Sequence, residues 1–570
     1  MCGIVGIWDP HGRIDADELN QLTDALSHRG PDGRGTHIDG PVGLGHRRLA
    51  ILDTTQSGAQ PMCYGGADGR RFWISYNGEI YNFLELRAEL AALGCTFRTQ
   101  SDTEVILAAF DTWGRDAVRR MNGMFAFAIW DSAKRELTLA RDRFGVKPLY
   151  FGLVGDRLIF ASELKAFLKV RGFVPEIDHQ IAHAAVQNAT GYEANDIATL
   201  MKGINRLTPG HILRIDAGGR FDIFRWWDTA AAAVDVPAKY EDQVAQFRAL
   251  LLDSVKIRMR SDVPIGTCLS GGVDSSAVAG VMAEIARTGG SHEREAAGAR
   301  HAFIASFPGT ALDETRFADA VAAHTGVTPH HWRFDDGDAV THVLDGVWSN
   351  DEIHPGMTSP MWSLYRRMRR DNVVVSLDGH GGDEVYGGYT WYLDAPTEKL
   401  NERLFLDTHI NVLPAILRNY DRAAMAHGVE VRMPLLDYRL VSFAFALPPA
   451  SKIGGGFTKR ILRDAVKGLI PEPIRRRRQK IGFNAPLIEL FNGGLAPLIE
   501  NIIAHPLWKA APYLEAAKLT PFIVERTRNR SWTMADWYSA TQIWARFNIV
   551  LWHALFIERN AGAFGTLSAG

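Results

Sequence analysis

The chain has 570 residues, of which 46% are hydrophobic and 22% are charged, with 63 Lys and Arg against 65 Asp and Glu. This length is too great for one hydrophobic core, so at least two domains are expected, and the composition excludes a disordered or fibrous chain. The net charge of −2 excludes a general polyanion-binding surface, so no nucleic-acid partner is expected. No apolar run reaches the roughly 18–20 residues that cross a bilayer. We therefore expect a cytoplasmic protein with no membrane partner, and the start of the chain shows no secretory signal.

The first part of the chain is predicted to fold as an α+β sandwich. Alternating apolar residues predict antiparallel strands near 72–76, 125–129 and 137–139, and helical spacing predicts helices over 16–27 and 83–93. A low-complexity stretch at 229–239 follows. We interpret it as part of a linker, because the composition changes there and a helix from about Tyr240 to Arg260 comes next.

In the second part of the chain, predicted strands alternate with predicted helices. Strands are predicted at 265–269, 302–307, 330–334 and 373–377, with helices after the first and second strands. This order predicts a parallel sheet with helices on both faces. A polar insert at 288–300 is expected to be a surface loop.

Cys2 is a candidate nucleophile. Removal of Met1 would leave Cys2 with a free α-amine, whose pKa of about 8 would let it act as a base for its own thiol. The position of Cys2 alone favours the simpler interpretation, a buried cysteine in a first strand. The four cysteines of the chain form no C-x-x-C pair, which argues against a thiolate zinc site.

Polar residues downstream would complement such a nucleophile. Asn77 and Gly78 follow an alternating strand, where Asn-Gly is typical of a hairpin turn, but an amide and a backbone N–H could also stabilise an oxyanion. Arg48 could clamp a carboxylate, and Glu79 and Asp102 could hold an α-ammonium group. Together these groups would fit an amino acid that carries a side-chain amide.

The motifs MCGIVG, HRGPD, HRRLAI, YNGEIYN and SDTE resemble, in order, those of the class II glutamine amidotransferases. The resemblance implies an Ntn-hydrolase sandwich (αββα) over residues 1–225, in which Cys2 attacks the glutamine amide and releases ammonia. It implies that Asn77 and Gly78 are catalytic as the oxyanion hole. The glutamine-binding residues that it implies are Arg48, Leu49, Ala50, Ile51, Leu52, Asn77, Gly78, Glu79 and Asp102.

The segment SGGVDSS, residues 270–276, lies between a predicted strand and a predicted helix. Its small residues would let backbone N–H groups approach a phosphate, at a helix N-terminus that favours negative charge. Asp274 would then ligate Mg²⁺. The alternative is a tight turn with capping serines.

A second glycine-rich loop, 378–384, follows the strand at 373–377, and both loops are expected at the same edge of the sheet. Asp383 would therefore share the magnesium ion with Asp274.

SGGVDSS resembles the PP-loop of ATP pyrophosphatases. With DGHGGDEVYGGY, HGVEVRMPLLD and TKRILR, it makes the second part similar to the synthetase domain of glutamine-dependent asparagine synthetases. The resemblance implies an adenine nucleotide α-hydrolase-like α/β domain over 240–558, after a linker at 226–239 and before a tail at 559–570. It also implies activation of a carboxylate, aspartate in that family, as an acyl-adenylate. Ammonia would arrive through an internal tunnel, and AMP and pyrophosphate would leave.

The resemblance assigns residues to this site as well. The ATP-binding residues that it implies are Leu269, Ser270, Gly271, Gly272, Asp274, Ser275, Ser276, Ala305, Asp378, Gly379, Lys459 and Lys480. The magnesium ligands are Asp274 and Asp383. A homodimer is a further expectation from the family.

One position departs from the family pattern. Aspartate-using synthetases carry Ser-Gly-Glu-Gly where this chain has Asp378-Gly379-His380-Gly381, so His380 replaces the glutamate and is the candidate catalytic base. Two acceptors therefore stay open: aspartate, or another carboxylate such as a cell-wall peptide, a uronic acid sugar or a peptide natural product. A non-catalytic relative is disfavoured, because the nucleophile and the PP-loop are both intact.

Overall fold

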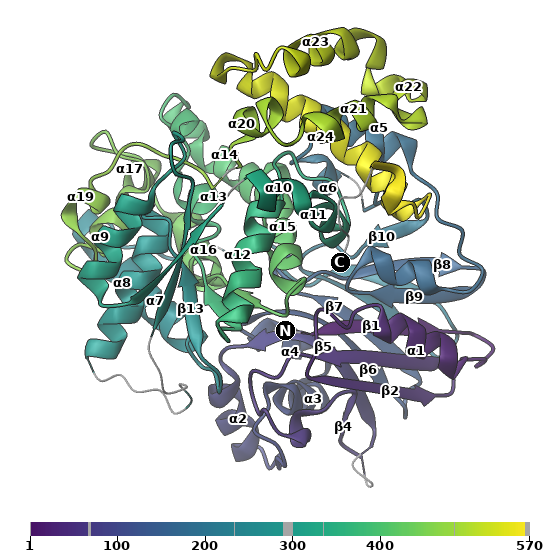
Figure 1. The fold of residues 1–570 in the computed structure, drawn as a ribbon. Helices are drawn as coiled ribbons and strands as arrows, with labels where there is room; N and C mark the ends of the chain where they lie inside the picture. The colour runs from purple at the N-terminus through teal and green to yellow at the C-terminus, as the bar shows by residue number, and fades with distance from the viewer. Residues whose placement is uncertain are drawn as a thin grey trace.

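The computed structural model describes residues 2–66, 70–195, 197–232, 234–288, 294, 300–334, 336–483 and 485–564. Two antiparallel sheets occupy the first part of the chain and a parallel sheet occupies the second (Figure 1). Of the insert expected at 288–300, only Thr288, Arg294 and Arg300 lie within the described residues. Among those residues, no helix is long and apolar enough to cross a membrane.

The first part contains two six-stranded sheets with the orders β10-β8-β9-β1-β3-β2 and β12-β11-β7-β6-β5-β4. Every pair of neighbouring strands in them is antiparallel. The strands of the first sheet are β1 (Gly3–Trp8), β2 (Gly33–Asp39), β3 (Val42–Arg48), β8 (Tyr150–Val154), β9 (Arg157–Ala161) and β10 (Ile204–Arg206). Those of the second sheet are β4 (Met62–Tyr64), β5 (Phe72–Ile80), β6 (Gly123–Asp131), β7 (Glu136–Arg141), β11 (His211–Ile215) and β12 (Phe221–Arg225).

Alternating side chains bury both faces of these sheets. Ile4 and Ala126 belong to the apolar core between the sheets. Their neighbours in sequence point the other way: Val5 packs in the core that contains α1 (Ala16–Asp24), and Phe125 packs in the core beneath α2 and α3. Helices α2 (Phe83–Ala92), α3 (Asp102–Trp113), α4 (Ala117–Arg120), α5 (His179–Gln187) and α6 (Tyr192–Asn195) complete this part. The predicted αββα sandwich is confirmed.

The second part is built on a five-stranded sheet with the order β15-β14-β13-β16-β17, in which all neighbours are parallel. Its strands are β13 (Ile265–Cys268), β14 (His301–Ser306), β15 (Thr328–Arg333), β16 (Val375–Leu377) and β17 (Glu430–Arg432). Helices α7, α8 and α9 lie on one face, and α12 and α15 lie on the other (Figure 1). The predicted parallel α/β sheet is confirmed. The strand β17 was not among the predicted strands.

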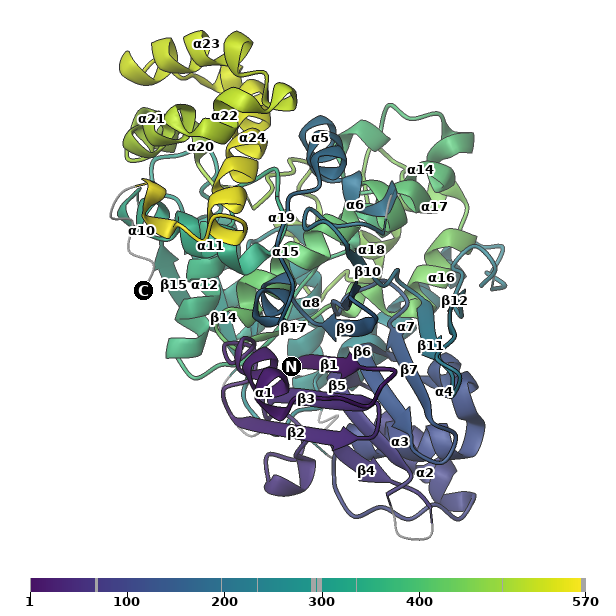
Figure 2. The ribbon, with the colours of Figure 1, turned by 90° about the vertical axis from the view of Figure 1, so that its right-hand side faces the viewer.

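The remaining helices surround this sheet and form a C-terminal layer. Around the sheet lie α7 (Tyr240–Arg258), α8 (Val273–Arg287), α9 (Thr315–Thr325), α10 (Asp336–Thr341), α11 (Val343–Asn350), α12 (Ser359–Arg370), α13 (Gly382–Tyr386), α14 (Leu400–Leu406), α15 (Leu413–Met425), α16 (Tyr438–Ala446), α17 (Pro449–Lys452), α18 (Arg460–Ala465) and α19 (Glu472–Arg475). The C-terminal layer contains α20 (Leu487–Asn492), α21 (Ala496–Ala504), α22 (Pro506–Ala510), α23 (Ala516–Arg528) and α24 (Trp537–Phe556). Figures 1 and 2 show this layer at the top of the molecule, where α24 contacts α5 and α11.

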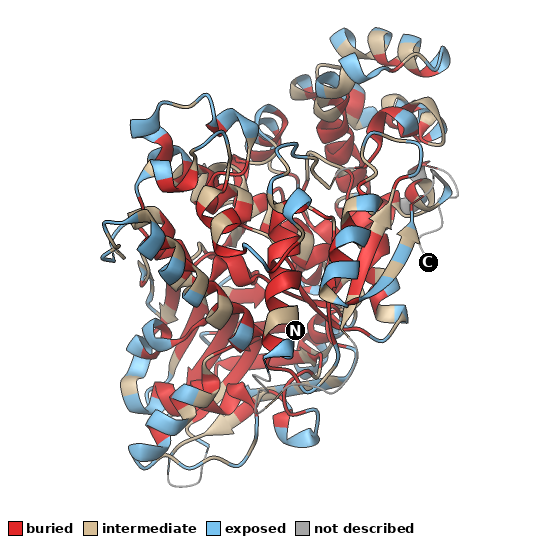
Figure 3. Ribbon diagram, turned by 90° about the vertical axis from the view of Figure 1, so that its left-hand side faces the viewer, coloured by how far each residue is buried: buried red, intermediate tan, exposed pale blue. Residues whose placement is uncertain are grey.

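Buried charges join the two parts of the chain. The carboxylate of Asp421, on α15, lies 3.0 Å from Arg29 Nη1 and 3.2 Å from Lys147 Nζ, and all three side chains are almost fully buried. In the same interface the Asn122 amide donates to Asp437 over 2.9 Å. Figure 3 shows the continuous buried interior that results. Cys2 lies beside this interface, because Arg29 also donates to its carbonyl, and Figure 1 shows the N-terminal end of β1 near the centre of the molecule.

Candidate active sites

Cys2 lies directly before β1, and its backbone is held on both sides. Its N–H donates to Asn77 Oδ1 over 3.0 Å, and Arg29 Nε donates to its carbonyl over 3.0 Å. Asn77 is fully buried, and its Nδ2 has no hydrogen-bond partner. Burial raises the pKa of the Cys2 thiol, an effect opposed by the Leu49 N–H and by Arg48. The site thus combines a buried thiol with an unused amide donor, which is the arrangement that an oxyanion on an attacked carbonyl needs.

Asn77 and Gly78 belong to β5 and form no turn. The strand continues to Ile80, and Gly78 pairs with Phe125 of β6. A Cβ atom at position 78 would lie 2.1 Å from the Met124 carbonyl oxygen, so only glycine permits this approach of the two strands. The hairpin interpretation is therefore wrong, because long-range pairing with β6 overrides the local turn preference.

A group of buried carboxylates lies beside the thiol. Asp102 Oδ2 accepts hydrogen bonds from Tyr76 Oη (2.8 Å) and the Ile80 N–H (3.0 Å). Burial raises the pKa of Glu79 and of Asp102, and Glu430 of β17 adds to both shifts. The Arg432 guanidinium lies 3.6 Å from Glu79 and opposes its shift. Because negative charge exceeds positive charge here, the group is suited to an ammonium ion.

Arg48 ends β3, and residues 49–52 form a loop that packs against the second part of the chain. Arg48 donates to the Thr55 carbonyl over 2.6 Å and to the carbonyl of Asp53, so its guanidinium holds this loop. Ala50 N donates to Asp32 over 2.9 Å, whereas Leu49, Ile51 and Leu52 are buried. Of the predicted glutamine residues, Asn77, Leu49 and Arg48 therefore interact with Cys2, and the Arg48 guanidinium is already bonded to main-chain oxygens.

The segment 270–276 joins β13 to α8. Gly271 has a φ of +72°, and a Cβ atom there would lie 2.5 Å from Phe317 Cβ, so the turn requires glycine. The hydroxyls of Ser270 and Ser275 lie 3.1 Å apart, and the Ser276 hydroxyl is buried without a hydrogen-bond partner. The backbone N–H groups at the start of the 15-residue helix α8 remain available to an anion.

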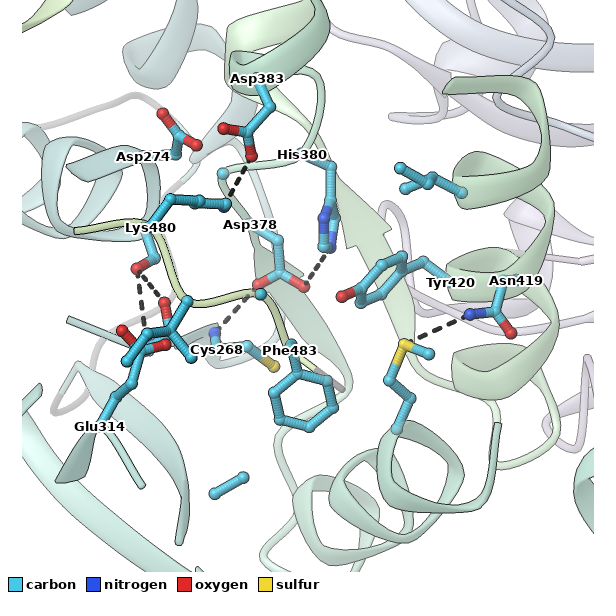
Figure 4. Close-up of a pocket in the computed structure, with 18 of the residues that line it drawn as sticks. Cys268, Asp274, Glu314, Asp378, His380, Asp383, Asn419, Tyr420, Lys480 and Phe483 are labelled. Atoms are coloured by element: carbon cyan, nitrogen blue, oxygen red, sulfur yellow. Dashed lines mark hydrogen bonds and ion pairs between the residues drawn. The ribbon is translucent and has the colours of Figure 1, made fainter. Parts of the chain in front are cut away.

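The two glycine-rich loops meet through a cluster of opposite charges. Lys459 Nζ bonds Asp274 and lies 2.6 Å from Asp383 Oδ1. Lys480 Nζ lies 2.8 Å from Asp383 Oδ2, a contact that Figure 4 shows. Although burial acts in the opposite direction, the two lysines hold the pKa of Asp383 well below its usual range. Burial raises the pKa of Asp274. Glycine at 379 and 382 is needed, because a Cβ at either position would lie 2.6 Å from Asp274 atoms.

Asp378 and His380 occupy different places in the second loop. Asp378 Oδ1 accepts from the Cys268 N–H over 2.9 Å and Oδ2 accepts from Tyr365 over 2.8 Å, so Asp378 joins the ends of β13 and β16. His380 Nε2 lies 3.5 Å from Asp378, and its ring packs on Tyr420 with 3.6 Å between the centroids (Figure 4).

A cavity of about 470 Å³ contains most of the predicted ATP site. The predicted residues that line it are Leu269, Ser270, Asp274, Ser275, Ala305, Asp378, Gly379, His380, Asp383 and Lys480. Gly272 and Lys459 line a smaller adjoining cavity, whereas Gly271 and Ser276 line neither of these two.

Sequence reasoning did not assign several polar residues to these sites. They are Arg29, Glu430 and Arg432 beside Cys2, and His354, Glu384, Asn419 and Tyr420 at the cavity. Arg29, Glu430 and Arg432 lie inside recognised motifs. A polar run in an otherwise apolar helix, at 418–422 of α15, was the available signal for Asn419 and Tyr420.

Comparison with known proteins agrees with this two-site organisation. Residues 1–227 match the family model of a glutamine amidotransferase domain, and residues 246–405 and 394–553 match that of asparagine synthase. The glutamine-hydrolyzing asparagine synthetases 1 and 3 of Bacillus subtilis are 28% and 31% identical to this chain. The first alignment covers 98% of this chain and 97% of the relative, and the second 84% and 86%. Asparagine synthetase B of Escherichia coli is 32% identical over 84% of this chain and 81% of its own length.

The fold and the matches define an enzyme of the ligase class with a glutamine amidotransferase domain. More particularly, the chain belongs to the family of glutamine-hydrolysing asparagine synthetases, in which ATP is a substrate.

Proposed function

We propose that this enzyme hydrolyses glutamine at Cys2 and uses the ammonia to amidate a carboxylate that it has activated with ATP. The observation that carries the first half is the contact between the Cys2 N–H and Asn77 Oδ1 at 3.0 Å, beside an Asn77 Nδ2 that has no partner. After removal of Met1, the Cys2 amine would take the proton of the thiol, which then attacks the amide carbon of glutamine.

The other residues of this site bind glutamine in our proposal. The Asn77 amide and the Gly78 N–H hold the oxyanion of the tetrahedral intermediate. Glu79 and Asp102 receive the α-ammonium group, because it would relieve the excess of buried negative charge beside them. Arg48, together with residues 49–52, contacts the α-carboxylate. To do so, the Arg48 guanidinium would give up its hydrogen bond to a main-chain carbonyl and donate to a carboxylate oxygen instead.

We place ATP in the 470 Å³ cavity, with its phosphates at the start of α8 and beside Lys459 and Lys480. Magnesium fits the two carboxylates Asp274 and Asp383, because both are oxygen donors that face one shared cation and Asp274 Oδ1 is buried without a hydrogen-bond partner. The ion would neutralise phosphate charge. Among the described residues no group of three or more His, Cys, Asp or Glu could hold a metal, so phosphate and water oxygens would complete its ligand set.

The activated carboxylate is an acyl-adenylate in this proposal, and pyrophosphate is its by-product. His380 stands where ammonia would attack and would accept the proton that ammonia releases. Ammonia would travel from Cys2 to this point inside the protein, past the buried interface around Asp421.

Aspartate and a different carboxylate are both candidate acceptors. The names of the relatives support aspartate, whereas His380 and the lining of the cavity favour a different acid. We also propose domains at 1–225 and 240–558 with a linker at 226–239 and a tail at 559–570, a cytoplasmic location and a homodimer.

Pyrophosphate release and glutamine hydrolysis, measured separately, test the two-site proposal. We expect Cys2→Ala to abolish glutamine hydrolysis and to preserve AMP and pyrophosphate formation when ammonia is supplied. Equal loss of both activities would contradict two separate sites, and release of ADP with phosphate would contradict adenylation.

A further inference from the structure

The charges that line the large cavity are distributed unevenly. Of the described residues in its lining, Lys480 is the only lysine or arginine, and it is paired with Asp383 on the phosphate side. Five carboxylates also line it: Asp274, Glu314, Asp378, Asp383 and Glu384. Figure 4 shows Lys480 and Asp274 on one side and Asn419 on the other, with His380 and Tyr420 between them. The side beyond His380 therefore offers no lysine or arginine to a second carboxylate of the acceptor.

An uncharged polar pair lies on that side. The Asn419 amide donates to His354 Nε2 over 3.2 Å, while Asn419 Oδ1 and His354 Nδ1 have no hydrogen-bond partner. Both residues line the cavity, and only 1% of Asn419 is exposed. Burial lowers the pKa of His354 to about 3, so its ring is neutral at cellular pH. Asn419 Nδ2 also donates to Met361 Sδ over 3.5 Å, so in this orientation the pair keeps one acceptor, Asn419 Oδ1, and one donor, the His354 Nδ1–H.

The pair is held in place by a buried ion pair behind it. Arg418 precedes Asn419 on α15 and bonds Glu193 at 2.8 Å, and it also donates to the Ile353 carbonyl next to His354. Arg418 thus fixes both partners from behind while its own charge is satisfied by Glu193. A preorganised donor and acceptor without partners suit a ligand that carries hydroxyl or amide groups.

Apolar and aromatic side chains also line the cavity. Met361, Leu364, Val412 and Ile416 line it together with Tyr420. At the rim, Tyr389 and Trp391 stack with 4.2 Å between their ring centroids, and Trp391 is 48% exposed. Such surfaces favour a flat, uncharged face of a ligand.

We propose that the acceptor is a monocarboxylic acid with an uncharged body that carries hydroxyl or amide groups, and that this body binds between Tyr420 and the His354–Asn419 pair. This inference rests on the adenylating function proposed above. Free aspartate fits poorly, because its α-carboxylate would be buried on this side of the cavity, whose described lining offers no lysine or arginine to pair with it. A uronic acid or an aspartyl side chain within a peptide satisfies the same chemistry.

A matched pair of acids tests the proposal. Free L-aspartate is compared with L-aspartate that is acetylated on its α-amine and amidated on its α-carboxylate, so that only the side-chain carboxylate keeps a charge. Galacturonate is the third acid. Its comparison with the capped aspartate distinguishes a sugar acid from a peptide as the acceptor. With ammonia as nitrogen donor, we expect kcat/KM for pyrophosphate release to be at least about tenfold higher with the capped aspartate or with galacturonate. Free aspartate as good as or better than both would overturn the proposal.

A substitution of Asn419 tests whether this residue contacts the acceptor acid. Asn419→Leu removes the donor and acceptor and is expected to lower kcat/KM for the preferred acid about tenfold, with KM for ATP and glutamine hydrolysis unchanged. Asn401→Leu is the matched control, since Asn401 donates to the Phe445 carbonyl outside the cavity lining. Equal effects of the two variants, or a changed KM for ATP in Asn419→Leu, would overturn the assigned contact.

A binding measurement distinguishes a wrong acceptor class from a wrong proposal of adenylation. The same acids are titrated into the wild-type protein by calorimetry in the presence of α,β-methylene-ATP, which cannot release pyrophosphate. Tighter binding of an uncharged-bodied acid supports the acceptor class even if no acid yields pyrophosphate, a result that would count against adenylation alone. Preferred binding of free aspartate, or no binding of any of the three acids, overturns the acceptor class.

Discussion

The amide of Asn77 is the most direct test of the glutaminase chemistry. Asn77→Ala removes the Nδ2 donor, which has no partner among the described residues, and the oxygen that accepts the Cys2 N–H over 3.0 Å. Loss of one oxyanion donor costs about 10²–10³-fold in kcat, or about 3–4 kcal/mol. The unpaired Cys2 N–H adds about 1–3 kcal/mol of lost folding stability. We therefore expect a large fall in kcat for glutamine with little change in KM.

The control is Ser75→Ala in the same strand. Ser75 is fully buried and donates to the Gly45 carbonyl over 2.9 Å, so its removal perturbs β5 without touching Cys2. Glutamate release is measured for both variants, with ammonia-dependent pyrophosphate release as the check on folding. A loss of kcat in Asn77→Ala no larger than that in Ser75→Ala would refute the oxyanion role.

Two further predictions concern stability. Burial lowers the pKa of His46 to about 3 from 6.5, so between these values the unfolded chain binds a proton that the folded protein does not. The free energy of unfolding should therefore fall on acidification through this window, by up to about 1.4 kcal/mol per pH unit. Urea unfolding at pH 7 and pH 5 measures this fall, which should be smaller in His46→Gln than in the wild type. An identical fall in both proteins would exclude His46 as its source. Asp421→Asn leaves Arg29, Lys147 and Arg422 without their shared carboxylate, and we expect about 3–5 kcal/mol of destabilisation in denaturant titrations. A loss below about 1 kcal/mol would show that the interface tolerates these charges.

The sequence predicted the fold best where the signal was local. Alternation in 72–76 and 125–129 identified β5 and β6, and the strand–loop–helix pattern around Ser270 identified β13 and α8. It also brought Asp274 and Asp383 together, because loops at the carboxyl ends of parallel strands share one edge. β17 was missed, since three residues between a helix and a turn carry too little periodicity to predict a strand.

The parts of the sites that could not be predicted depend on distant partners. Asp421 and Arg29 are 392 positions apart, and nothing near either residue indicates the other. Asn77-Gly78 has the local pattern of a turn, and only its pairing with β6 makes it a strand. Likewise, Asn419 and His354 become a pair only when α15 packs beside the segment before α12.

The shared carboxylate of Asp421 has a practical consequence for anyone who wishes to cut this protein in two. A glutaminase fragment that ends near residue 225 would keep Glu163 as a partner for Arg29, but Lys147 would lose the Asp421 carboxylate, and the fragment would expose an apolar surface around this uncompensated cation. A usable fragment would therefore carry a neutral residue in place of Lys147. The same reasoning explains why the halves are best produced as one polypeptide.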